Sequence, residues 1–327
     1  MCVSYFQVTN KTYLSLSSDS ETEDLDDRFL QLITVHGRDY QKYSIDHNIC
    51  FQPVDDDEVE RLELQHRVFN KVFNDRLIFP PLPDLESPRI PRRILDCGHG
   101  TASWAIEVAE QNPRCEIIGV DISPQMNPDN TPDNLWLQVD DLNRPFTFPS
   151  NHFDLVHSRM LATGIDRVRW LSYIQDIKRV LKPGGWVQMV EMYFNVQSDN
   201  GSLTEQHALR QWSTKFMRSL DDKKDLRVGT RLRDLLLAAG MDQVDARMIP
   251  LPLSGWANEP RVRGIGAANV ESTKQLLSAV ALYPMTKRLR MPYEEFQELI
   301  SRAQQEAETL GLKAYFPLYV CIGRKPR

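Results

Sequence analysis

Apolar and polar positions alternate along the middle of the chain in a pattern that predicts short buried strands separated by amphipathic helices. Ile94 and Leu95 end one apolar run, and after a glycine turn apolar positions recur at helical spacing from Trp104 to Ala109. The other predicted strands in this region share the short apolar pattern and cover residues 116–121, 135–139, 153–157 and 186–191. Strands that alternate with helices indicate an α/β fold, a parallel sheet with helices on both faces.

The pattern changes after residue 200. Residues 200–220 and 230–239 are predicted helices, residues 244–249 a sixth strand, and residues 257–310 a mostly helical insertion. A final strand is expected over 314–322. Pro317 lies inside this strand and cannot donate a backbone hydrogen bond, so we expect an edge position or a bulge there.

The N-terminal part divides into two segments before the main domain. Residues 1–28 are acidic and rich in hydroxyl side chains, which predicts a disordered tail. Residues 29–92 predict a helical cap and a proline-rich linker, and the main helix of the cap begins among the acids that follow Pro53. The main domain is expected to cover residues 93–327.

Charge and cysteine usage narrow the class of protein. The net charge of −6 gives no basic field, so we expect neither a nucleic-acid partner nor an anionic membrane partner. No apolar run approaches the roughly 20 residues of a membrane span, and we expect no secretion signal. The five cysteines lack metal spacing and fit reduced thiols, so we expect no metal site and a cytoplasmic location, with a nuclear one left open.

The stretch from Asp96 to Gly100 carries the clearest chemical signal. Gly98 and Gly100 permit a tight turn and a close approach of a ligand to the backbone. Asp121, at the end of the next predicted strand, is placed to accept hydrogen bonds from ribose hydroxyls. A dinucleotide site would have a third glycine at Ser103, whereas the Asp-x-Gly-x-Gly form resembles motif I of class I S-adenosylmethionine (SAM) methyltransferases.

Acidic residues recur at the carboxyl ends of successive predicted strands, at Asp96, Asp121 and the pair Asp140 and Asp141. Ligands of parallel sheets bind outside these strand ends. An acidic rim suits a cationic sulfonium and a hydroxylated nucleoside but repels a pyrophosphate. The sequence therefore predicts SAM as the cofactor, with S-adenosylhomocysteine as its product.

Four longer stretches carry a more specific resemblance, and they cover residues 53–66, 94–105, 153–161 and 314–326. Through them, from His36 to the end, the chain resembles the fungal SAM-dependent methyltransferases grouped with LaeA, a velvet-associated regulator of secondary metabolism. The resemblance implies a Rossmann-like, doubly wound sheet of seven strands with the last strand antiparallel. It also implies an N-terminal helical cap and helical lid insertions near 195–228 and 254–312.

The resemblance also assigns cofactor-binding roles. Gly98 and Gly100 would line the methionine moiety, and Asp121 would hold the ribose hydroxyls. The other expected cofactor residues are Asp141 and Leu142 beside the adenine, Tyr43 closing over the cofactor, and Asp96, Ile122, Asp140 and His157. Two positions depart from the family: Ala102 replaces a common glycine, and His99 replaces a small residue and would crowd the methionine end or point outward.

An acceptor with a phenol, carboxyl or enol group would need a base or an orienting group. His157 and Arg159 are the first candidates, because they follow the strand over 153–157 and are expected to face the cleft. Glu191, at the end of a later strand, is the second candidate. The alternatives are structural: His157 bonded to a loop carbonyl, Arg159 paired with an acid, and Glu191 supporting the cofactor or a loop.

The sequence thus predicts a SAM-dependent methyltransferase that acts on a small-molecule acceptor, foremost by O-methylation of a fungal polyketide or related secondary metabolite. Two alternatives stay open. One is a regulator that works through protein partners, and the other is a SAM-binding relative that steers a pericyclic or cyclisation reaction. A homodimer and a regulatory protein partner are left open as well.

Overall fold

The computed structural model describes residues 2–4, 22–23, 25–82 and 91–327, and the statements below refer to these residues. The disordered tail expected over 1–28 lies largely outside them. Where this segment is described, β1 (Cys2–Ser4) and β2 (Thr22–Glu23) form short strands, and a 3₁₀ helix covers Asp27–Phe29.

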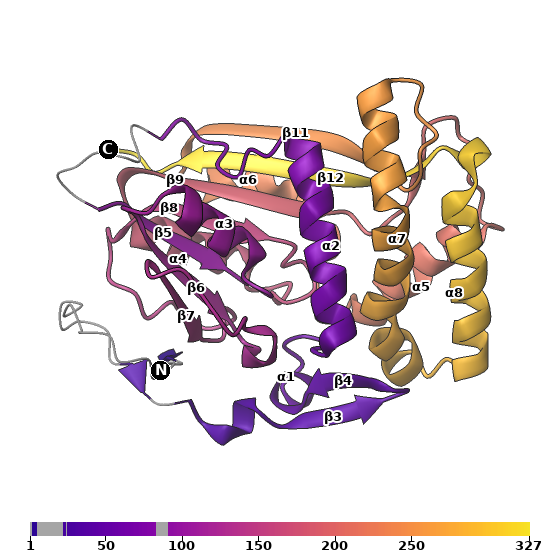
Figure 1. Ribbon diagram of the computed structural model, residues 1–327, viewed down its shortest axis with the longest axis horizontal. Helices are drawn as coiled ribbons and strands as arrows, with labels where there is room; N and C mark the ends of the chain where they lie inside the picture. Colours follow the sequence, from indigo (N-terminus) through magenta and orange to yellow (C-terminus); the bar gives the residue numbers. More distant parts are fainter. Residues whose placement is uncertain (1, 5–21, 24, 83–90) are drawn as a thin grey trace.

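A sheet whose central strands are parallel organises the fold (Figure 1). The parallel strands are β5 (Arg93–Cys97), β6 (Glu116–Asp121), β7 (Leu135–Val139), β8 (Phe153–Arg159) and β9 (Leu181–Met192). Their order is β7-β6-β5-β8-β9, so the chain reverses direction across the sheet between β5 and β8. Ligands of such sheets bind at this reversal point, outside the carboxyl ends of the strands.

Two C-terminal strands complete the sheet. β12 (Ala314–Arg324) runs antiparallel to β9, and β11 (Asp242–Pro252) runs antiparallel to β12. With the five parallel strands they form the expected doubly wound, seven-stranded arrangement, and β1, β2 and β10 (Gln197–Ser198) extend its edges. The predicted fold class is confirmed.

The expected edge position of Pro317 is wrong, because β12 has partners on both sides. Pro317 lies one residue beyond the register with β9, where the Tyr193 N–H donates to its carbonyl over 2.9 Å. Its register partner in β11 is also a proline, Pro250. A proline is tolerated here because the ladder to β9 ends at this point, so few hydrogen bonds are lost.

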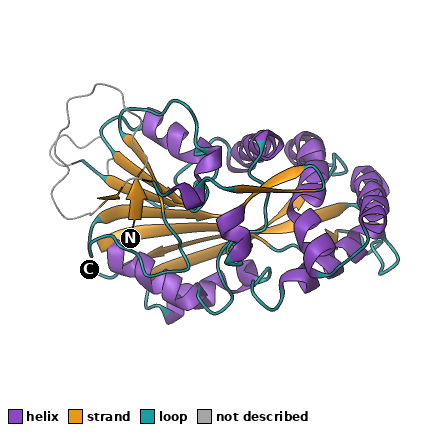
Figure 2. Cartoon of the chain, turned by 90° about the horizontal axis from the view of Figure 1, so that it is seen from below, coloured by secondary structure: helices purple, strands orange, loops and turns teal. Residues whose placement is uncertain are grey.

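Helices cover both faces of the sheet (Figure 2). α3 (Ser103–Gln111) packs with Ile94 in one core cluster, whereas α4 (Trp170–Val180) packs with Leu95 in another. Neighbouring residues of a strand point to opposite faces, so Ile94 packs on one face of the sheet and Leu95 on the other. α6 (Leu232–Ala238) packs beside α4 and β11.

Helices before and after the sheet strands pack together beyond its carboxyl end. α2 (Asp56–Phe73) lies beside α7 (Pro260–Tyr283), and α8 (Tyr293–Glu308) contacts both α7 and α5 (Ala208–Leu220), as Figure 1 shows. The N-terminal segment adds the hairpin β3 (Leu32–Val35) and β4 (Arg38–Gln41) and the short helix α1 (Lys42–Asp46). Within the described residues, none of the helices has the length and apolar content that a membrane span requires.

Candidate functional site

A pocket lies at the carboxyl ends of β5, β6, β7 and β8, beneath α2 and the loop over residues 49–54. It contains about 880 Å³ of empty space, part of it open to solvent. The structure brings most of the expected site residues to its wall, namely Gly98, Gly100, Asp121, Ile122, Asp140, Asp141, Leu142 and Arg159.

The glycine turn has a backbone conformation that favours glycine at both positions. Gly98 has a φ of +71° and Gly100 a φ of +57°, values that favour glycine. A β-carbon added at Gly98 would stand 2.3 Å from Cδ2 of Leu161. Ala102, which caps α3, also has a positive φ, +59°, so this departure from the family strains the backbone by about 1 kcal/mol.

His99 points toward the sheet, so it neither crowds the methionine end nor faces solvent. A β-carbon at Gly119 in β6 would stand 3.0 Å from Cδ2 of the His99 ring, and Nδ1 lies 3.0 Å from the Gly100 carbonyl oxygen. Burial lowers the pKa of His99, so the ring is neutral at pH 7. The absence of a side chain at Gly119 accommodates it.

The acidic rim is held in place by backbone hydrogen bonds. The carboxylate of Asp121 accepts from the Gly100 N–H and the Ser123 N–H, each over 2.9 Å. Oδ1 of Asp140 accepts from the Asp141 N–H over 2.8 Å. A carboxylate has about four lone-pair sites, so Asp121 retains acceptor capacity for the hydroxyls of a ligand.

Three expected cofactor residues do not reach the pocket wall: Asp96, Tyr43 and His157, the last of which is described below. Asp96 is buried beneath the glycine turn, and burial raises the pKa of its carboxyl to about 7. Tyr43 packs against the ring of Phe29, with 4.6 Å between ring centroids, and beside Ile122. Cofactor contacts by Asp96 and Tyr43 therefore remain predictions that the pocket geometry does not support.

The expectation that His157 faces the cleft is wrong. β8 continues to Arg159, so residue 157 lies inside the sheet rather than just past it. The buried ring stacks on Trp104 with 3.8 Å between centroids, and its Nδ1 lies 2.9 Å from Nε2 of Gln188. An amide nitrogen can only donate, so Nδ1 accepts. Burial holds the pKa of His157 well below its ordinary value, and the ring is neutral.

Glu191 supports a loop instead of lining the pocket. Its two carboxyl oxygens accept from the backbone N–H groups of Leu161 and Ala162 over 2.8 and 3.0 Å. The side chain is fully buried, and burial raises its pKa to about 8. Of the three catalytic candidates, the structure thus separates Glu191 and His157 from the pocket and leaves Arg159.

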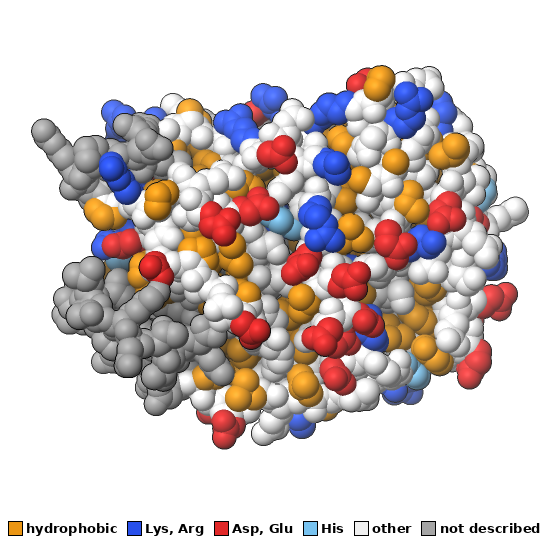
Figure 3. Space-filling model, viewed as in Figure 1, with side chains coloured by type: hydrophobic (Ala, Val, Ile, Leu, Met, Phe, Trp, Pro, Cys, Tyr) orange, Lys and Arg blue, Asp and Glu red, His pale blue; other side chains and the backbone are white. Residues whose placement is uncertain are grey.

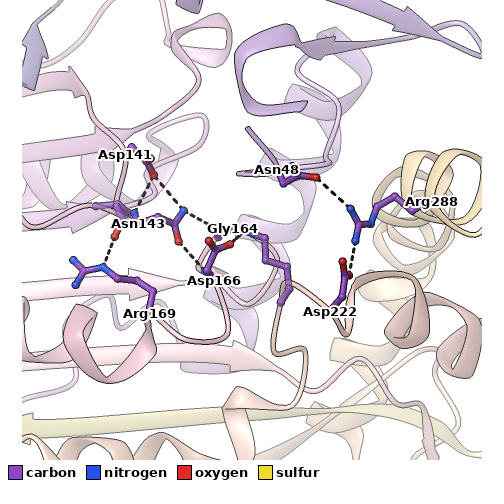
Figure 4. Close-up of polar contacts among 10 residues, drawn as sticks. Asn48, Asp141, Asn143, Gly164, Asp166, Arg169, Asp222 and Arg288 are labelled. Carbon is purple, nitrogen blue, oxygen red and sulfur yellow. Dashed lines mark hydrogen bonds and ion pairs between the residues drawn. The ribbon is translucent and has the colours of Figure 1, made fainter. Parts of the chain in front are cut away.

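The supported loop, residues 160–165, forms one pocket wall and is held from a second side (Figure 4). Asn143 donates to the Gly164 carbonyl over 3.1 Å and accepts from the Asp166 N–H over 2.7 Å. The Asn143 side chain also donates to Asp141 over 3.2 Å. The rim acid and the loop therefore form one polar network.

Arg159 presents a partly buried guanidinium to the pocket. Its Nη1 donates to Nδ1 of His66 over 3.2 Å, and its charged end lies over the Phe69 ring at 5.3 Å. Burial lowers the pKa of Arg159 to about 10, so it stays charged at pH 7. Within the described part of the chain, no carboxylate lies within the 4.0 Å of an ion pair with Arg159. The expected pairing of Arg159 with an acid is not observed.

His66 orients this guanidinium from α2. Its Nε2 lies 3.1 Å from Oε1 of Glu107 in α3, while Nδ1 accepts from Arg159. Burial and the nearby Arg159 lower the pKa of His66 to about 4, so His66 is neutral at pH 7. A neutral ring can accept from Arg159 and donate to Glu107 at the same time.

The sequence analysis missed Arg61, which lines the pocket from α2. The side chain is 2% exposed and forms two hydrogen bonds to Glu58, Nε to Oε2 over 2.9 Å and Nη2 to Oε1 over 2.7 Å. The available signal was the spacing of Glu58, Arg61 and Gln65, which places polar residues on the buried face of the helix.

Charge elsewhere is mixed. The face in Figure 3 has Lys and Arg side chains mainly along its upper part and Asp and Glu side chains across its middle. Within the described residues, no group of three His, Cys, Asp or Glu side chains is placed to hold a metal ion.

Comparison with known proteins agrees with this geometry. Residues 94–185 match the family model described as a methyltransferase domain, which covers the glycine turn and the strands from β5 to β8. The chain is 28% identical to the secondary metabolism regulator laeA of Aspergillus niger, over 89% of this chain and 76% of that protein. It is 29% identical to a protein of Emericella nidulans named protein-methionine methyltransferase laeA, with the same coverage.

Among solved structures, Haemonchus contortus phosphoethanolamine N-methyltransferase 2, in complex with S-adenosylhomocysteine, is similar with a TM-score of 0.48 and 19% identity. That match covers 80% of this chain and 53% of the other. Residues 94–185 thus match a methyltransferase domain, and about nine-tenths of the chain is similar in sequence to the laeA proteins.

Proposed function

We propose that this chain is a SAM-dependent methyltransferase that methylates an oxygen atom of a small metabolite. The observation that carries the proposal is one pocket that joins Gly98, Asp121 and Leu142, from three strand ends, to the guanidinium of Arg159. The first three suit a sulfonium nucleoside, and the fourth suits an acceptor with a negatively charged oxygen.

The residues present fit SAM. Gly98 and Gly100 line the part of the pocket proposed for the methionine moiety, Asp121 retains lone pairs for ribose hydroxyls, and Asp141 with Leu142 forms a wall for the adenine. When bound, SAM supplies a methyl group already activated by its sulfonium. The task left to the protein is to align the acceptor and exclude water, and alignment alone can lower the barrier by roughly 7–11 kcal/mol.

The remainder of the pocket suits an apolar acceptor. Its wall includes aliphatic side chains from the cap, α2, the 160–165 loop and α7: Ile49, Val54, Leu62, Ile165 and Leu276. Small-molecule sites are mostly apolar with a few placed polar groups, and this pocket has that composition. The enclosing helices favour a small molecule over a folded protein.

The absence of a nearby histidine restricts the chemistry. In the described part of the chain no histidine lines the pocket, since His99 and His157 both point elsewhere. An acceptor that enters as a carboxylate, or as an ionised acidic phenol or enol, needs no base. Its oxygen forms the new bond to the methyl carbon while the carbon–sulfur bond breaks and its electron pair stays on sulfur. Arg159 would orient the oxygen before transfer.

The relative named a protein-methionine methyltransferase supports a second candidate, a methionine side chain of a partner protein. A thioether also needs no base. Transfer only moves the positive charge from the cofactor sulfur to the methionine sulfur. The methionine thioether is neutral beforehand, however, so the charge of Arg159 would hold it less strongly than an anionic oxygen. A partner methionine would also have to enter beneath α2. We therefore favour the anionic oxygen.

The test is methyl-labelled SAM added to the purified chain with an extract of cells that produce secondary metabolites. We expect label in an extractable small molecule, and none with Asp121→Asn. Label released by mild base would identify a methyl ester, and stable label an ether. Label in protein would support the second candidate, and an isomerised but unlabelled product would support a cyclisation.

A further inference from the structure

A buried guanidinium that uses only part of its hydrogen-bonding capacity lies in the pocket wall. Arg61 donates from Nε and Nη2 to the two oxygens of Glu58, and both side chains are at most 2% exposed. Its third nitrogen, Nη1, is buried and has no hydrogen-bond partner in the described part of the chain. An unsatisfied buried donor costs about 1–3 kcal/mol, and more when it is charged.

The position of Arg61 is fixed before any ligand arrives. The fork-to-fork contact with Glu58 holds the guanidinium plane. Asp55 caps the start of α2 by accepting from the Glu58 N–H over 3.1 Å, and Arg38 of β4 donates to Asp55 over 2.8 and 2.6 Å. Such a pre-ordered donor loses little entropy when it binds a ligand.

Arg61 lies on the turn of α2 that contacts the glycine turn. Its neighbour Leu62 lies against the glycine turn, since a β-carbon at Gly100 would stand 3.5 Å from Cδ1 of Leu62. Both Arg61 and Arg159 line this pocket, one from α2 and one from β8. Glu58 already balances the charge of Arg61, whereas the charge of Arg159 has no carboxylate within ion-pair distance among the described residues.

We infer that Arg61 is a ligand-binding residue whose Nη1 donates to a carboxylate of the bound ligand, with the net charge of Arg159 balancing that carboxylate. The inference rests on the proposed function. The carboxylate has two sources: the amino-acid end of SAM, or the acceptor. A carboxylate satisfies the unpaired donor with charge-assisted hydrogen bonds, which are about twice as strong as neutral ones.

Calorimetric titration of the full chain distinguishes the two sources. S-adenosylhomocysteine carries the amino-acid carboxylate, and 5′-methylthioadenosine lacks it. Benzoate, titrated into the S-adenosylhomocysteine complex, serves as the acceptor probe. The variant is Arg61→Lys, which retains a charge for Glu58 but removes the Nη1 donors. The control is Arg67→Lys on the same helix, whose side chain is 60% exposed and which does not line the pocket.

We expect Arg61→Lys to lower the affinity for S-adenosylhomocysteine about 10- to 100-fold and to leave the affinity for 5′-methylthioadenosine unchanged. That result would identify the carboxylate bound by Arg61 as the one of the cofactor. If the affinity for both nucleosides is unchanged and the affinity for benzoate falls at least about tenfold, the carboxylate bound by Arg61 belongs to the acceptor. Equal weakening of both nucleosides would overturn the inference, since Arg61 would then serve only the fold. Unchanged binding of all three probes would overturn it as well.

Two further results keep the outcomes separate. If Arg61→Lys unfolds, the paired variant Glu58→Gln with Arg61→Gln removes both buried charges together and is titrated in its place, with the same expectations. If the unaltered chain binds neither nucleoside, the proposed function itself fails. If it binds both and the variants bind equally well, only the role of Arg61 fails.

Discussion

The side chain of Leu161 occupies the space in which Gly98 would carry a β-carbon. The two residues come from different strand ends, Gly98 after β5 and Leu161 after β8, and the missing β-carbon would stand 2.3 Å from Cδ2 of Leu161. Leu161 is itself fixed, because its backbone N–H donates to Glu191 over 2.8 Å. The glycine turn and the opposite wall of the pocket therefore fit each other directly.

Replacing Gly98 by alanine tests this fit. Gly201 has the same φ, +71°, but nothing within 4 Å of an added β-carbon. We expect Gly201→Ala to lower the free energy of unfolding by about 1 kcal/mol, the strain of a left-handed alanine. Gly98→Ala should lower the free energy of unfolding by more than twice that amount, because Leu161 must move. It should also lower the affinity for S-adenosylhomocysteine at least about tenfold. If denaturant unfolding gives the two variants equal losses in free energy of unfolding, Leu161 does not restrict the space at Gly98.

The sequence predicted that these strand ends come together because its signals there are local. Gly98, Gly100 and Asp121 lie within single strand–turn units, where spacing alone places them at the carboxyl end of the sheet. His157 and Glu191 do not reach the pocket, for a reason that sequence spacing cannot reveal. β8 and β9 run further than predicted, so both side chains lie within the sheet.

His157→Asn tests the corrected position of His157. The substitution removes the stacking on Trp104, and we expect a loss of about 2 kcal/mol in the free energy of unfolding. Affinity for S-adenosylhomocysteine should stay within about threefold, because the ring does not line the pocket wall. Calorimetric titration beside denaturant unfolding measures both. A tenfold loss of affinity in a fully folded variant would return His157 to the cofactor site.

The raised pKa of Asp96 makes the free energy of unfolding depend on pH. Burial raises its pKa in the folded state to about 7 from an ordinary value of 3.8, so the folded state retains a proton that the unfolded state releases. Stability from this group therefore falls as the pH rises from about 4 to 7, by up to about 1.4 kcal/mol per pH unit. Asp96→Asn should flatten the slope of unfolding free energy over that range. Glu191, whose pKa is about 8, adds a slope of the same sign that remains in the variant. An unchanged slope would show that Asp96 titrates normally.

The cap side of the pocket could not be predicted because its contacts join distant parts of the sequence. Arg288, in the helical turn that follows α7, contacts Asn48 and Asp222, as Figure 4 shows. It donates to the Asn48 side chain over 3.3 Å and lies over the Phe51 ring at 4.9 Å. These contacts hold the loop that contributes Ile49 and Cys50 to the pocket. Sequence spacing gives no indication that residues about 240 positions apart meet.

Arg288→Met tests this connection. We expect faster amide hydrogen exchange in residues 47–54, with the exchange of β5 and β6 unchanged, because only the cap loses contacts. Lys287→Met, at the neighbouring position, is the control, since the charge lost is the same and Lys287 has no such contact to Asn48 or Phe51. If residues 47–54 exchange their amide hydrogens at the same rate in both variants, the contacts of Arg288 do not stabilise the cap loop.

The most direct test of the account is the binding of S-adenosylhomocysteine to the purified chain, measured by isothermal titration calorimetry. We expect one site per chain, with affinity lowered at least about 100-fold by Asp121→Asn, which removes the charged acceptor for the ribose hydroxyls. Asp242→Asn, an exposed acid in β11, should bind as the unaltered chain does. No binding by the unaltered chain, or equal binding by the folded Asp121→Asn variant, would contradict the assignment of this pocket to SAM.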